Sequence, residues 1–196
     1  MLFCCVAGWQ PAGHENEVAA LLHHEDDLHL DLRTLSFRFV FAPPGPPKPA
    51  AALESYMANG AGTVQGARDH EKQVQIEFWQ RAAKEGFTDE RARASAQKFR
   101  AEFDALDRTL AAQSYLMGAE LSVLDIAWLI YAHRLSLAGY PLARLHPNVF
   151  AWKERLSAMP AFAKEIGMLR HSPEQLDAIH RKQEAAGGTL EQVAGF

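Results

Sequence analysis

The sequence predicts an all-α fold, a bundle of packed helices, and three observations carry this prediction. The first is a capped and almost entirely apolar run between Tyr115 and Ala138. The second is a pair of long segments, 14–41 and 88–110, in which apolar residues recur every three or four positions. The third is that no convincing run of alternating apolar and polar residues marks a β-strand. With 196 residues, 48% of them hydrophobic, the chain is long enough for one domain with its own core.

The central run opens with a helix N-terminus signature, a serine followed three positions later by an acid. The Ser122 hydroxyl can accept from the backbone N–H of Asp125, and the Asp125 carboxylate can accept from the N–H of Ser122. We therefore predict a structural capping box at these two residues. Apolar residues follow on almost every side through Leu135, which predicts a helix buried at the centre of the fold. The run is too short to be a membrane span.

Composition narrows the classes of function. A formal net charge of −4 and the lack of a basic cluster in the sequence argue against a nucleic-acid partner. Cys4 and Cys5 are neighbours with no third cysteine to pair with, which indicates a reducing compartment. The apolar start lacks a basic region of the kind that precedes a secretory signal, so a cytoplasmic protein without a membrane span is expected.

The first half of the chain is expected to hold one long helix and an inserted segment. Residues 1–13 have no strong period and are expected to be an unstructured leader. A helix is predicted over 14–41, with one apolar stripe toward the domain core and a second stripe on roughly the opposite side, formed by Leu30, Phe37 and Phe41. The second stripe needs a partner, which could be the inserted segment, another subunit or a missing domain. Prolines after residue 41 end the helix.

The rest of the chain is expected to be helical as well. Short or medium helices are predicted over 50–59 and 69–85, on either side of a flexible join at 60–66. A packed helix is predicted from Thr88, and Asn148 is expected to cap a later one. Ser172 and Gln175 predict a second capping box, on a helix that ends near Gly187. Residues 188–196 are expected to be a tail.

An ordered set of motifs resembles the C-terminal helical domain of glutathione S-transferases. The set comprises Leu116-x-Gly118-x-x-Leu121-Ser122-Val123-x-Asp125-Ile126, then Gly139-Tyr140-Pro141, Pro147-Asn148-x-x-x-Trp152 and Met159-Pro160-Ala161-Phe162. The resemblance covers roughly residues 14–170. It implies a glutathione S-transferase C-terminal-like helical domain over 14–187, in which an insertion at 43–86 expands the connection between the first two long helices.

The resemblance also implies what the chain could do. Members of that family bind glutathione mostly through an N-terminal thioredoxin-like domain, and the pattern of that domain is not found in this sequence. We therefore expect a helical domain that shapes the electrophile pocket and the dimer interface, without glutathione conjugation by this chain alone. Glutathione is the expected cosubstrate only if a donor domain is present. The expected partners are a second copy of the chain or a thioredoxin-like domain, and a small apolar electrophile.

Candidate substrate-binding residues follow from the same resemblance, which places the early half of the long helix and the core helix beside the electrophile pocket. They are His29, Arg33 and Phe37 from the first helix and Trp128 and Tyr131 from the second. Apolar residues at helical spacing are usually packing residues, so Trp128 and Tyr131 could equally belong to the core and Phe37 to an interface. No catalytic residue is assigned.

Three further interpretations stay open or are set aside. A non-catalytic interaction module would use the stripe of Leu30, Phe37 and Phe41 as its contact surface. A ligandin-type carrier of apolar molecules would use the electrophile pocket alone. His23 and Asp27 are one helical turn apart, but without a second paired motif a solvated helix face explains them better than a metal site.

Overall fold

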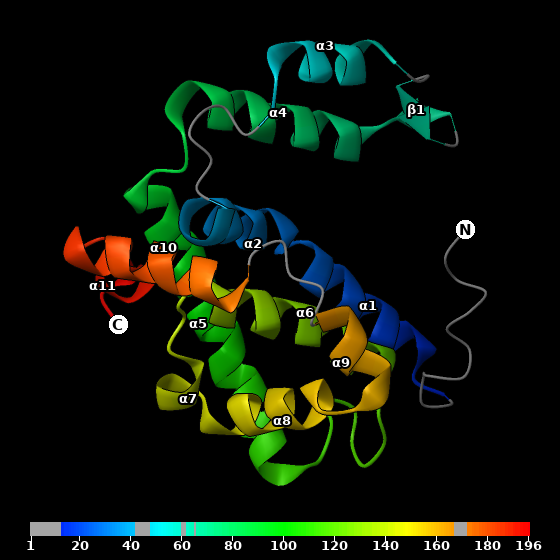
Figure 1. Cartoon of the computed structure of the whole chain (residues 1–196). Helices are drawn as coiled ribbons and strands as arrows, with labels where there is room; N and C mark the ends of the chain where they lie inside the picture. Colours follow the sequence, from blue (N-terminus) through cyan, green and yellow to red (C-terminus); the bar gives the residue numbers. More distant parts are fainter. Residues whose placement is uncertain (1–12, 42–47, 60–61, 65, 167–171) are drawn as a thin grey trace.

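The computed structural model describes residues 13–41, 48–59, 62–64, 66–166 and 172–196. All but the last residue of the expected leader at 1–13 therefore lies outside the described residues. Within them the fold is all-α, as predicted, and Figure 1 shows α6 at the centre, with α3 and α4 lying above α2. The elements in chain order are α1 (Glu15–Asp26), α2 (His29–Leu35), the π-helix η2 (Ser36–Phe41), α3 (Ala50–Ala58), β1 (Thr63–Val64), β2 (Ala67–Arg68), α4 (His70–Glu85), α5 (Asp89–Ala112), α6 (Val123–Leu137), α7 (Leu142–Leu145), α8 (Pro147–Ser157), α9 (Pro160–Ile166), α10 (Pro173–Ala185) and α11 (Leu190–Ala194).

The segment predicted as one long helix is divided into α1, α2 and η2. A tight turn separates α1 from α2, where the backbone N–H of Leu28 bonds the carbonyl of Glu25 at 3.0 Å, three residues back instead of four. After α2 the chain continues in the wider π-helical register. The prediction of a single continuous helix is wrong, because apolar spacing survives a tight turn and does not report the hydrogen-bond register.

The second apolar stripe of this segment packs against the inserted helix α4. Phe78, Trp79 and Ala82 are buried there, and Leu30 and Phe37 pack against them. The Phe37 ring lies 5.3 Å from that of Trp79, centroid to centroid, in an edge-to-face arrangement. Among the three partners considered for the stripe, the inserted segment is the one that the structure supplies.

The predicted join at 60–66 contains a strand. Thr63 pairs with Arg68 and Val64 with Ala67 in a two-stranded antiparallel hairpin that connects α3 to α4. The expectation of no strand is wrong for these residues, because two-residue strands are too short to show an alternating pattern. Residues 60, 61 and 65 lie outside the described residues.

The core surrounds α6, as the capped apolar run predicts. Trp128 is 3% exposed and Leu129 is 2% exposed, and both belong to the same buried cluster as Phe99 and Phe103 of α5. The four-and-three spacing along α5 turns these two phenylalanines to one face. Ile130 is the exception on α6, since 49% of its surface is exposed.

The start of α8 differs from the prediction that Asn148 caps it. His146 occupies the cap position without a side-chain hydrogen bond to the helix, and Pro147 is the first helical residue. The carboxylate of Asp107 on α5 accepts from the backbone N–H groups of Asn148 at 2.7 Å and Val149 at 3.0 Å. A residue on another helix therefore satisfies these free N–H groups, and sequence spacing within α8 could not indicate it.

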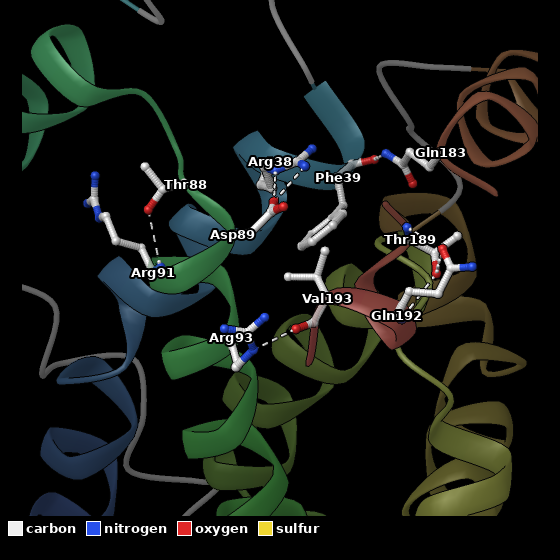
Figure 2. A network of polar contacts seen from close by, with 10 residues as sticks. All are labelled: Arg38, Phe39, Thr88, Asp89, Arg91, Arg93, Gln183, Thr189, Gln192 and Val193. Atoms are coloured by element: carbon white, nitrogen blue, oxygen red, sulfur yellow. Dashed lines mark hydrogen bonds and ion pairs between the residues drawn. The ribbon is translucent and has the colours of Figure 1, made fainter. Parts of the chain in front are cut away.

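The expected tail at 188–196 is part of the fold. It contains α11, in which Leu190 is 1% exposed and Thr189 forms a capping box with Gln192. Figure 2 shows how the C-terminal helices are tied to the first half of the chain. The Arg93 guanidinium donates to the carbonyl of Val193, and the Gln183 amide donates to the carbonyl of Phe39, both at 2.9 Å. A five-residue helix carries too little periodicity to be predicted.

Candidate functional site

The predicted capping box at Ser122 and Asp125 is confirmed, and it is larger than predicted. The fully buried Asp125 carboxylate accepts from the backbone N–H of Ser122 at 2.9 Å and from its hydroxyl at 2.6 Å. Its other oxygen accepts from the N–H of Leu116 and the indole N–H of Trp152, both at 2.9 Å. Four donors compensate for removing this charge from water. Asp125 therefore joins the loop before α6 to α8 and serves the fold.

Trp128 and Tyr131, two of the candidate substrate-binding residues, lie in the core. Their ring centroids are 5.6 Å apart, and Trp128 lies 6.1 Å from Phe103. The Tyr131 hydroxyl donates to the backbone carbonyl of Glu25 at 3.1 Å. Burial, followed by the charge of Glu25, raises the pKa of Tyr131, so its hydroxyl stays protonated. The geometry favours the packing alternative for both residues, since Tyr131 is 6% exposed and its hydroxyl bonds the backbone of α1.

His29 and Arg33 meet α4 through one side chain, Gln75. The His29 Nδ1 lies 2.6 Å from the carbonyl of Asp26, which can only accept, so Nδ1 carries the proton. The Gln75 amide nitrogen then donates to His29 Nε2 at 2.6 Å. The amide oxygen of Gln75 accepts from the Arg33 guanidinium. This chain of hydrogen bonds fixes the imidazole, the amide and the guanidinium relative to one another.

The Arg33 guanidinium lies against the aromatic rings of α4. Its central carbon is 5.6 Å from the centroid of Phe78 and 5.3 Å from that of Trp79, within the range of cation–π attraction. Burial lowers the pKa of Arg33, and the positive charge of Arg134 lowers it further. Among the described residues, no carboxylate forms an ion pair with Arg33. The third candidate on this helix, Phe37, packs in the same aromatic cluster.

Two more cations reach this junction from the inserted segment. The Lys48 ammonium lies 4.8 Å from the centroid of Trp79. The Lys72 ammonium donates to the carbonyl of Asn59 and lies 5.4 Å from the centroid of Tyr56. We call Arg33, Lys48, Lys72 and Arg134 the basic corner. Sequence reasoning found only Arg33, because the other three stand far apart in the chain.

The interpretation as an interaction module depended on the stripe of Leu30, Phe37 and Phe41 as its contact surface. Leu30 and Phe37 are half-buried and pack against α4, and the Phe41 ring lies 5.5 Å from that of Phe37. The stripe is therefore covered within the chain itself.

The polar cluster of α1 is spread over the surface. His23 and Asp27 are exposed, and the His24 ring bonds the Glu102 carboxylate at 2.9 Å. Within the part of the chain that the structure describes, no three His, Cys, Asp or Glu side chains lie close enough together to hold a metal ion. The same residues include no helix with the length and hydrophobicity to cross a membrane.

The fold places the chain among all-helical domains, with a buried central helix, α6, that begins at a capping box. Residues 80–155 match the family model of the glutathione S-transferase C-terminal domain. The match supports a glutathione S-transferase C-terminal domain over these residues, and there it confirms the resemblance predicted from the motifs. The matched segment runs from the end of α4 through α5, α6 and α7 into α8. Comparisons with curated proteins and with solved structures returned no match.

Proposed function

We propose that this chain is the electrophile-binding helical part of a glutathione transferase of the cytoplasm, and that the junction of α2, α4 and α6 receives the electrophile. The observation that carries this proposal is the half-buried Arg33, held by Gln75 beside the rings of Phe78 and Trp79. Ligand sites combine apolar walls with a few fixed polar groups, and this junction has both.

The reaction proposed for the assembled protein is attack of the glutathione thiolate on the bound electrophile. A donor domain would hold glutathione and lower the pKa of its thiol. The described residues contain only the short hairpin of β1 and β2 as sheet, so they include no thioredoxin-like unit. Conjugation is therefore proposed to need a donor domain, in the same protein or in a partner.

A homo-oligomer remains a proposal that rests on the family resemblance. Light scattering of the purified chain at micromolar concentration tests it, with a dimer or larger species expected. A monomer over that concentration range would contradict it.

A second candidate function is that of a carrier, favoured by the same observation. The aromatic and cationic groups of the junction are assembled without a donor domain, so a ligand could bind to this chain alone. Displacement of a fluorescent apolar dye by hydrophobic ligands, without glutathione, would support this function.

Two titrations test the proposed function. In the first, glutathione is titrated calorimetrically into the purified chain, and no binding is expected; sub-millimolar affinity would contradict the need for a donor domain. In the second, chlorodinitrobenzene, an aromatic electrophile, is titrated into the chain and into Trp79→Leu. We expect weaker binding by Trp79→Leu and unchanged binding by Phe150→Leu, a matched change at an aromatic residue on α8. Equal binding by both variants would place the electrophile elsewhere.

A further inference from the structure

We propose that the basic corner, Arg33, Lys48, Lys72 and Arg134, binds an organic oxyanion: a carboxylate or phosphate group carried on a flat or apolar body. This inference rests on the proposed function for the location of the site, and it names the chemical class of the ligand. It changes the expected electrophile from a neutral apolar molecule to an acidic one.

The first step of the argument is the pattern of ion pairs. Elsewhere, Arg38 meets Asp89 at 2.7 Å, Lys98 meets Asp31 at 2.7 Å and Arg144 meets Glu191 at 2.6 Å, whereas Arg93 and Arg155 bond backbone carbonyls. In the basic corner, the structure records no ion pair with any described carboxylate. This matters most for Arg33, because its guanidinium is half-buried.

The second step is the cost of leaving Arg33 unpaired. A guanidinium that is partly removed from water is destabilised unless an anion or several acceptors compensate it. Gln75 accepts one of its hydrogen bonds, and the rings of Phe78 and Trp79 lie against it. The remaining N–H donors of the planar fork suit the two oxygens of a carboxylate or phosphate.

The third step is the presence of a second arginine, Arg134, near Arg33. Arg134 projects from α6, is exposed, and lies near enough for its charge to lower the pKa of Arg33. The helices that carry the two arginines, α2 and α6, contact each other. Neither arginine forms an ion pair with a described carboxylate, and two like charges near each other attract an anion.

The fourth step concerns the body of the ligand. Tyr56 and Met57 on α3 are 46% and 45% exposed, beside the ammonium group of Lys72. Trp79 and Phe78 are each only 7% exposed and lie behind Arg33. An anion with an aromatic or apolar body can therefore place its charge beside the arginines and its body against the exposed Tyr56 and Met57.

The test is calorimetric titration of three ligands that share one ring system into the full chain. Naphthoate carries a carboxylate, naphthyl phosphate carries a phosphate, and naphthamide is neutral. We expect at least one of the two anions to bind roughly tenfold more tightly than the amide, since charge-assisted hydrogen bonds contribute more than neutral ones. The stronger of the two anions identifies the preferred head group. The advantage should shrink as salt is raised.

Variants of single arginines test which residues cause the tighter binding of the anions. Arg33→Gln and Arg134→Gln should each bring the affinity for the anion close to that for the amide. Arg134 makes no recorded side-chain bond among the described residues, so Arg134→Gln should fold even if Arg33→Gln loosens α4. Arg108→Gln, a change at an exposed arginine on α5, should retain the advantage.

The outcomes separate this inference from the proposed function. If all three ligands bind equally, the junction takes apolar molecules, the proposed function stands and the oxyanion site is wrong. If anions are preferred equally by wild type and Arg134→Gln, the oxyanion site is also wrong. If no ligand binds, both proposals fail.

Discussion

Two arginines five positions apart on the same helical segment have opposite surroundings. The Arg38 guanidinium donates twice to the Asp89 carboxylate, at 3.0 Å from Nε and 2.7 Å from a terminal nitrogen (Figure 2). Arg33 has no such carboxylate and bonds the amide of Gln75. The first arginine ties η2 to the start of α5. The second forms one side-chain hydrogen bond with the described residues, which leaves N–H donors for the ligand proposed above.

The same contrast holds for the two regions around them. On the side of α10 and α11, polar side chains bond partners within the chain: Gln183 bonds the carbonyl of Phe39, and Arg93 bonds that of Val193. On the side of α3 and α4, Lys48 and Lys72 lie against rings and a neutral carbonyl, although Arg81 of α4 pairs with Glu85. Under the proposals above, the first region serves stability and the second serves binding.

The largest effect on the free energy of unfolding is expected at Asp125, the buried carboxylate that accepts four hydrogen bonds. Asp125→Ala removes the acceptor of four hydrogen bonds and leaves buried donors unpaired, so we expect a loss of about 3–5 kcal/mol in the free energy of unfolding. Urea denaturation measures it. Asp177→Ala, at an exposed acid of α10, should change nothing measurable. A loss below about 1 kcal/mol in Asp125→Ala would contradict the role given to this carboxylate.

A smaller and more local effect is expected on the binding side. Trp79→Ala removes a buried ring from the small cluster that holds α4 on α2, and we expect a loss of about 2–4 kcal/mol confined mainly to that contact. Hydrogen exchange should accelerate in α4 while the amides of α6 keep their protection. Phe150→Ala serves as the control, because Phe150 is 37% exposed. Equal acceleration in α4 and α6 would mean that the two regions unfold together.

A third prediction concerns a buried histidine of the structural side. His146 is 1% exposed, its Nε2 lies 2.8 Å from the Tyr140 hydroxyl, and burial lowers its pKa from 6.5. The unfolded chain therefore binds a proton at this histidine more readily than the folded chain does. The free energy of unfolding falls as the pH drops below about 6.5 toward the folded pKa, with a slope of up to about 1.4 kcal/mol per pH unit.

Urea denaturation across this pH range measures the slope, and His146→Gln should reduce it. A residual slope is expected, because burial also lowers the pKa of His133. An unchanged slope in His146→Gln would assign the pH dependence to other groups.

The smallest effect sharpens the comparison between the two arginines. The side chains of Arg38 and Asp89 are 29% and 53% exposed, so their ion pair should contribute only about 0–1 kcal/mol. Arg38→Gln should therefore cost little in thermal stability and leave naphthoate affinity unchanged, whereas Arg33→Gln should lower the affinity. If both variants lose affinity equally, the charge of the whole helix attracts the anion and the basic corner has no special role.

The features that were predicted from the sequence are local. The box at Ser122 and Asp125 depends on residues three positions apart, and the buried face of α5 on a regular spacing, so both could be read directly. Another partner of Asp125, Trp152, lies 27 positions away, and no local pattern indicates that pairing. The helix α11 is too short for a pattern.

The basic corner was missed for a related reason. Arg33, Lys48, Lys72 and Arg134 are isolated in the sequence, so composition suggested no basic cluster. The inserted segment places Lys48 against Trp79 and Lys72 against Tyr56, and the contact of α2 with α6 brings the second arginine. A binding surface assembled from separate helices becomes visible only in the folded chain.

The central claim, that a ligand's negative charge lies between Arg33 and Arg134, is tested most directly by a crystal structure of the chain with a brominated naphthoate. The bromine would be located by its anomalous scattering. The account predicts a carboxylate within hydrogen-bond distance of both guanidinium groups and a bromine beside Tyr56 or Met57. A bromine at another place, such as the cleft of about 550 Å³ lined by His180, Gln183 and Phe196, would contradict it.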